Sequence, residues 1–234
     1  MSTEQASTAA PSQGWWPPDK DDIRSRVADV NDGVLAVAGL AEGLSLVLET
    51  HSLPTIVTVA AIAGAVSIGG ATYAETAAER EVQQELIRTE QYLLELSPDE
   101  ELDELVQHFR GKGVSEQTAR RVADELNAAD ALTAQLETEY GIREILSPGE
   151  PFKEALASSL SFLAGALVTV LIAMTVPRVW VEEYILLGVL LSLSVTAVVL
   201  SRLGGTRVWP SILRSMAIGL GAMGASLLVG ALIG

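Results

Sequence analysis

Five apolar runs, each close to the roughly 20 residues that a helix needs to cross a bilayer, constrain this chain more than any other feature. They cover about residues 33–52, 54–73, 155–176, 179–200 and 210–233. Inside a bilayer every backbone polar group needs a partner within the chain, so runs of this length favour helices. Strand patterning is absent, and 49% of the residues are hydrophobic, which argues against an ordinary soluble protein. The sequence therefore predicts an all-α, polytopic membrane protein with five transmembrane helices.

A long acidic segment, residues 77–150, lies between the second and third runs. It holds most of the carboxylates behind the net charge of −15, and this excess argues against nucleic acid as a partner. Helix starts are predicted at Ser97 with Pro98 and Glu100 as a capping box, at Ser115, and at Asp130 or Thr133, with helix ends at Gly111, Gly113 and Gly141. The segment is thus expected to be a water-soluble helical insert.

The remaining organisation follows from these runs. Residues 1–26 are polar, lack the basic and apolar regions of a signal peptide, and predict a disordered tail. Residues 27–76 are expected to hold the first two membrane helices, and residues 151–234 the last three. Cysteine is absent, so neither disulfides nor thiolate metal sites can form.

Lysines and arginines set the expected orientation. They cluster before the first run, within or beside the insert, and between the fourth and fifth runs, whereas only Arg178 falls between the third and fourth. Under the positive-inside rule, the N-terminus and the insert are therefore cytoplasmic. We expect an integral multi-pass protein of a prokaryotic plasma membrane.

Two carboxylates, one at the mouth of the first run and one inside it, are candidates for a path through the membrane. Asp32 either caps the helix that begins there or faces the bundle interior as a cation or proton ligand. Glu42 falls near mid-run, where a carboxylate is costly and usually functional, although it could be a neutral side chain bonded to a neighbouring helix. Glu42 lies about 15 Å beyond Asp32 along a helix, and ten residues is close to three turns. We therefore expect both on nearly the same side, with Asp32 at the cytoplasmic entrance and Glu42 near the midplane.

Carboxylates in the insert are candidates for a divalent-cation site. Glu101 and Glu104 are one helical turn apart, and Glu90 and Glu139, on other predicted helices, could converge with them. The alternative is a solvated acidic helix face. His51 and His108 are lone histidines that we interpret as incidental, and no catalytic motif occurs in the sequence, so an enzyme is not expected.

The order of these parts resembles the vacuolar iron transporter family. The resemblance rests on Asn-Asp-Gly at residues 31–33, a small-residue second run continuing into a long acidic helix, the helix beginning at Pro98, and Glu-Tyr-Gly-Ile at residues 139–142. It covers about Arg24 to the C-terminus. It implies a dimeric five-span protein that exchanges ferrous iron or manganese for protons and carries a cytoplasmic, glutamate-rich metal-binding domain.

The resemblance also assigns residues. It places the family's first-span aspartate on Asp32. The metal-binding glutamates fall on Glu90, Glu101, Glu104 and Glu139.

Five positions depart from the family pattern. The second-run glutamate and methionine are replaced by Ala60 and Ile68, a further glutamate of the first acidic helix by Leu93, and a methionine pair by Gln135 and Leu136. The translocation site would lose a carboxylate and a sulfur ligand, and the insert would keep oxygen ligands only. This weakens any preference for iron over manganese, magnesium or calcium.

Two functions are consistent with these departures. The first is a divalent metal/proton antiporter in which Glu42 supplies the membrane carboxylate from the first span. The second is a family-like membrane protein that binds metal or a partner through its insert without transporting metal. The expected partners are divalent cations (ferrous iron, manganese or another ion), protons, the lipid bilayer and a second copy of the chain.

Overall fold

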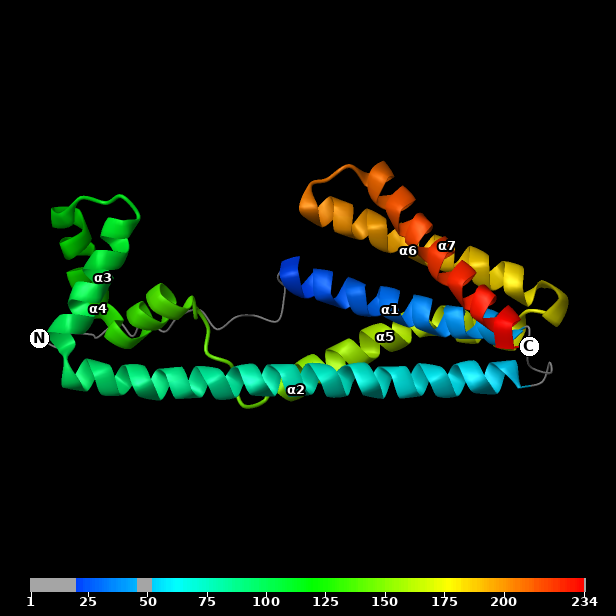
Figure 1. The fold of residues 1–234 in the computed structure, drawn as a ribbon, viewed down its shortest axis with the longest axis horizontal. Helices are drawn as coiled ribbons and strands as arrows, with labels where there is room; N and C mark the ends of the chain where they lie inside the picture. The colour runs from blue at the N-terminus through cyan, green and yellow to red at the C-terminus, as the bar shows by residue number, and fades with distance from the viewer. Residues whose placement is uncertain (1–19, 46–51, 234) are drawn as a thin grey trace, which may run out of the picture. The chain divides into compact units, whose positions relative to one another are not determined.

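The computed structural model describes residues 20–45 and 52–233, and within these ranges helices are the only regular secondary structure (Figure 1). Its helices are α1 (Lys20–Ser45), α2 (Leu53–Leu96), α3 (Pro98–Gly111), α4 (Glu116–Tyr140), α5 (Glu150–Thr175), α6 (Val181–Gly204) and α7 (Val208–Ile233), with a 3-10 turn, η1 (Arg178–Trp180), before α6. The all-α prediction is confirmed for the described ranges. His51 and the predicted tail up to residue 19 lie outside them.

The chain divides into two compact units, which we describe separately. The bundle unit comprises Met1–Gly69 and Leu156–Gly234, and the insert unit comprises Gly70–Ala155. The α2 helix runs through the division without a break, so it contributes its first part to the bundle unit and its second part to the insert unit.

Four helices in the described part of the chain are long and apolar enough to cross a membrane. They are α2, the Arg178–Gly204 segment that includes α6, and the helices α5 and α7. The first predicted run is not among them, because its last residues, 46–51, are not described and the first half of α1 is polar. A span count of five thus stays a prediction.

The α1 helix begins earlier than the sequence predicted. Its first residue is Lys20, so residues 20–26, expected in the disordered tail, are helical. Asp21 and Asp22 lie in the first turn, where negative charge is favourable beside the partial positive charge of a helix N-terminus. Good helix formers continue from there into the apolar run, and nothing in this stretch ends a helix.

The core of the bundle unit lies along one stripe of α1. Val34, Val37, Ala38 and Ala41 follow the spacing of one helix face, and each is at most 1% exposed. The α1 helix packs against α6 and α7, which also pack against each other. In a bilayer this association depends on close packing more than on transfer of apolar surface from water.

Glycines allow α1 to approach two neighbours at backbone distance. A Cβ added to Gly33 would lie 2.0 Å from the backbone oxygen of Phe162 in α5, and one added to Gly165 would lie 2.0 Å from that of Val30. At the other end of α1, a Cβ on Gly230 of α7 would lie 2.2 Å from the backbone oxygen of Gly43. Side chains larger than hydrogen would therefore separate these helices.

In the insert unit, α3 and α4 pack against each other around Leu105, Val106, Ala119 and Ala123. The sequence located the ends of these helices well. Proline at the first position opens α3, but Ser97 makes no side-chain capping bond, so the predicted capping box is wrong in that detail.

Two further predicted boundaries are confirmed in α4. Ser115 caps its start by accepting a hydrogen bond from the Thr118 amide, and Gly141 ends it in the left-handed conformation at φ 69°. The helix is interrupted at Asp130, whose backbone is extended. Asp130 Oδ1 accepts a hydrogen bond of 3.1 Å from the Thr133 amide, so a new helical segment starts there as predicted. The hydrogen bonds from Thr133 lower the pKa of Asp130.

Candidate functional site

The carboxyl group of Glu90 is the most unusual polar group in the insert unit. The α2 helix holds it in the interior, where the residue is 0% exposed. Neither of its oxygens accepts a hydrogen bond from any donor of the described residues. Burying an uncompensated carboxylate is costly, so this group requires either a proton or a cation.

Burial and the negative charges of three other glutamates raise the pKa of Glu90. Burial comes first among the causes that raise the pKa of Glu90 to about 7, followed by the charge of the neighbouring Glu101 carboxyl and then the charges of Glu139 and Glu104. Because burial and these negative charges disfavour an ionised Glu90, the cluster holds a proton readily. Burial, and then the charges of Glu101, Glu139 and Glu100, also raise the pKa of Glu104.

The four glutamates assigned from the family resemblance thus interact, although they come from three helices. Glu90 lies on α2, Glu101 and Glu104 on α3, and Glu139 on α4. In the described part of the chain, however, no group of three or more histidine, cysteine, aspartate or glutamate side chains is arranged to hold a metal ion. The cluster is therefore a set of repelling oxygen donors that a cation could draw together, rather than a formed coordination shell.

Two residues that sequence reasoning did not assign to the site also belong to this cluster. Gln135 is 2% exposed, and its Nε2 donates to the backbone oxygen of Glu101 at 2.5 Å and to Glu101 Oε2 at 3.3 Å. The residue that replaces a family methionine therefore orients a glutamate. Burial and the charge and hydrogen bond of Glu139 raise the pKa of Tyr140 to about 12. The sequence could have pointed to Tyr140, because this residue directly follows Glu139.

Asp32, the first membrane candidate, lies inside α1 and does not cap it, because the helix begins at Lys20. Its neighbour Gly33 contacts the middle of α5, and its other neighbour, Asn31, accepts a 2.7 Å hydrogen bond from Thr196 Oγ1 in α6. The Asp32 side chain is exposed on the bundle unit. The N-cap alternative is thus wrong, and the location of Asp32 at the mouth of the first span stays a prediction.

Glu42, the second candidate, is 4% exposed and lies three residues before Ser45, the last described residue of α1. The charges of Glu182 and Glu183, in the first turn of α6, act on it. Glu42 therefore lies level with the start of α6 rather than near the middle of the bundle.

The expectation that Asp32 and Glu42 face the same side is also wrong. Asp32 is exposed, whereas Glu42 is buried. The physical reason is helix geometry, because ten residues at about 100° each leave the two side chains about 80° apart.

A buried charged group that the sequence analysis missed lies one turn before Asp32. Asp29 is 9% exposed, and its Oδ2 is 3.7 Å from the guanidinium of Arg26. Arg26 also donates a 2.9 Å hydrogen bond to Ser158 Oγ in α5. The polar half of α1 thus brings a second carboxylate into the bundle unit, and the signal for it was an Arg-x-x-Asp spacing that matches one helical turn.

Two of the departures from the family pattern, Ala60 and Ile68, lie in the second apolar run. Ile68 packs against the core of the bundle unit, and Ala60 is half-buried, so neither supplies a ligand. His108 makes an edge contact with the Phe109 ring, with centroids 5.5 Å apart, which is consistent with an incidental role.

Comparison with known proteins adds two findings. The VIT family matches residues 23–231 of this chain. A protein of Acanthamoeba castellanii described as a vacuolar iron transporter is 29% identical over 188 residues, which cover 80% of this chain and 69% of that protein.

Proposed function

This chain belongs to the VIT family, and from that premise we propose that it exchanges ferrous iron or manganese for protons across a membrane. Four apolar helices of spanning length make it a multi-pass integral membrane protein, and its family and its relative support a metal ion transporter. The specific ions, the proton exchange and the absence of enzymatic activity belong to our proposal.

One observation supports metal binding by the insert unit more than any other. Glu90 is fully buried without a hydrogen-bond donor, and the charges of Glu101, Glu104 and Glu139 act on it. A divalent cation would relieve their repulsion, and oxygen donors suit manganese, ferrous iron, magnesium and calcium. Protons and cations would compete for the same carboxyl groups, which is the coupling that an exchanger needs.

We propose that Asp29, Asp32 and Glu42 give the bundle unit the carboxylate that Ala60 does not supply. Asp32 is exposed on the bundle unit, and a carboxylate facing lipid would be costly. A second copy of the chain over this face would shield Asp32 from lipid, which supports a homodimer. We propose that Asp32 receives the cation and that Glu42 exchanges a proton for it.

The alternative is a VIT family member that binds metal but does not transport it. It is favoured by Ala60 and Ile68, because those positions supply no ligand to the bundle. The test that separates metal binding from an incidental acidic cluster is calorimetry on the full-length protein in detergent.

Manganese should bind the wild-type protein, and changing Glu90, Glu101, Glu104 and Glu139 together to glutamine should abolish the heat of binding. Four glutamine substitutions at Glu79, Glu81, Glu85 and Glu95, exposed on α2, serve as a control for lost charge. Identical isotherms for the wild type and the first variant would show that these glutamates are not the site.

A further inference from the structure

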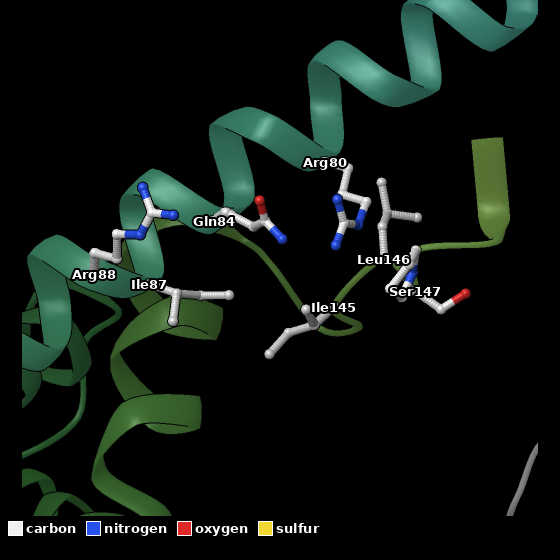
Figure 2. Close-up of a pocket in the computed structure, with 8 residues that line it drawn as sticks. Arg80, Gln84, Ile87, Arg88, Ile145, Leu146 and Ser147 are labelled. Carbon is white, nitrogen blue, oxygen red and sulfur yellow. The ribbon is translucent and has the colours of Figure 1, made fainter.

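A groove of about 440 Å³ lies in the insert unit, between α2 and the segment that follows α4 (Figure 2). Its lining includes two arginines, Arg80 and Arg88, and no carboxylate. This is unusual for its surroundings, because acidic residues far outnumber basic ones between Gly70 and Ala155. The groove is therefore a local cationic site within an acidic unit.

The wall opposite α2 is held in place by a buried side chain. Gln83 is 7% exposed, and its Oε1 accepts a 2.9 Å hydrogen bond from the backbone amide of Leu146. This bond joins the segment after α4 to α2 across 63 positions of the sequence. The groove is thus formed by the fold and does not depend on a chance position of a surface loop.

Arg80 is the donor best placed to receive a ligand. Its Nε is buried and has no hydrogen-bond partner among the described residues. Figure 2 shows the Arg80 guanidinium and the Gln84 amide extending from α2 toward the residues Ile145–Ser147. A buried donor without a partner is rare in native proteins, because leaving it unsatisfied costs free energy.

The other polar side chains of the groove already have partners. Arg88 donates to Glu85 at 3.1 Å, and Ser147 Oγ donates to Glu150 at 3.3 Å. Arg80 and Gln84 thus remain as the pair that offers N–H groups to an anion. A guanidinium fork matches the geometry of phosphate oxygens and can bind two of them at once.

The apolar part of the lining and the place of Arg80 on α2 indicate where such an anion would come from. Ile87, Ile145 and Leu146 line the groove beside the two donors. Arg80 lies seven residues beyond Tyr73, the end of the second apolar run, which is about 10 Å along a helix. The headgroup layer on each side of the hydrocarbon core is about 5–8 Å thick, so the Arg80 backbone lies just beyond it and a long arginine side chain can reach an anionic headgroup.

We propose that this groove is a phosphate-binding site, in which Arg80 and Gln84 hold the phosphate of an anionic lipid headgroup or a free phosphate. The proposal is independent of metal transport. It assigns a cationic groove of the insert unit to an anion, whereas the glutamate cluster of the same unit is assigned to cations.

Thermal unfolding of the full-length protein in detergent provides the test. The probes are dioctanoyl phosphatidic acid, inorganic phosphate and, as a lipid without phosphate, dioctanoylglycerol. We expect phosphatidic acid to raise the unfolding midpoint of the wild type with saturation and dioctanoylglycerol to leave it unchanged, because a ligand that binds the folded state stabilises it by mass action.

Arg80→Gln should weaken the apparent affinity at least about tenfold, since it removes charge-assisted hydrogen bonds. Arg121→Gln, which removes the same charge from an exposed position on α4, should bind as the wild type does. If Arg80→Gln does not fold, Gln84→Leu takes its place with the same expectation.

The two sources of phosphate give different results. An Arg80-dependent shift with both probes identifies a general phosphate site, and a shift with phosphatidic acid alone identifies a lipid headgroup site. Unchanged affinity in Arg80→Gln, or no shift of the wild type with either probe, would overturn the proposal.

Discussion

Glu90 links the protonation of the insert unit to its metal binding. Its carboxyl is fully buried, no donor among the described residues compensates it, and burial together with Glu101 raises its pKa to about 7. Near neutral pH the group is therefore poised between a proton and a cation. A cation that binds there must displace the proton, so metal affinity is expected to fall as pH falls below about 7.

The same shift predicts how stability depends on pH. Because the pKa of Glu90 rises from 4.5 to about 7 on folding, the folded state binds the proton more tightly. This contribution to stability is fully present below about pH 4.5 and is lost as pH rises through about 7. Without metal, the unfolding midpoint should fall from pH 5 to pH 8, and Glu90→Gln should reduce that fall. Thermal unfolding of the full-length wild type and of Glu90→Gln, each at pH 5 and pH 8, measures this change in midpoint.

Manganese should restore the stability lost at pH 8 in the wild type, by about 2.7 kcal/mol at a hundred times its Kd. Glu90→Gln should lose most of this gain. Glu95→Gln, on an exposed position of the same helix, should behave as the wild type. A wild-type midpoint that rose between pH 5 and pH 8 without metal would contradict the account of Glu90.

Individual site residues were predictable only where the signal was local or came from the family. The resemblance named Glu90, Glu101 and Glu104, but spacing alone could not bring residues of three helices together. The family resemblance marks Gln135 only as a lost ligand, whereas its role as a donor to Glu101 depends on a contact across 34 positions. Such contacts have no periodicity in the sequence.

At the scale of elements, α1 is the helix that the bundle unit is packed around. Its apolar stripe is almost fully buried, and its glycines bring α5 and α7 to backbone distance. The sequence predicted helix ends well where glycine, proline or a capping side chain marks them, as at Pro98, Ser115 and Gly141. It missed the start of α1, because residues 20–26 carry charges that we interpret as typical of disorder although they are compatible with a helix.

A glycine substitution tests the crossing of α1 and α5. Gly33→Ala should destabilise the protein, because the added Cβ would lie 2.0 Å from the backbone oxygen of Phe162 and the two helices would have to separate. Overpacking of this kind costs about 1–3 kcal/mol. Gly70→Ala in α2 is the matched control, since nothing lies within 4 Å of its added Cβ. This control should be neutral or slightly stabilising, because alanine favours a helix by about 1 kcal/mol over glycine.

Thermal unfolding in detergent compares the two variants. Equal midpoints for Gly33→Ala and the wild type would show that α1 and α5 do not cross as closely as described.

At the scale of the whole molecule, the chain combines an apolar bundle unit with an acidic insert unit. Four spanning helices are described, and a membrane crossing by α1 would make five, which places the two termini on opposite sides of the membrane. Arginines beside the insert and between α6 and α7 favour a cytoplasmic N-terminus and insert.

Single cysteines test this topology, because the chain has none of its own. Ser52→Cys should react with an impermeant thiol reagent added to intact cells, whereas Ser97→Cys and Thr206→Cys should react only after the membrane is opened. Labelling of Ser97→Cys from outside would rule out a cytoplasmic insert.

Metal uptake into liposomes that contain the purified protein tests the proposed exchange most directly. We predict that an outward proton gradient drives manganese or ferrous iron into the vesicles and that protons leave in return. Asp32→Asn should slow uptake, and Glu42→Gln should remove its dependence on the gradient. Wild-type protein that binds manganese but moves none, or moves it at the same rate with and without the proton gradient, would contradict metal/proton exchange.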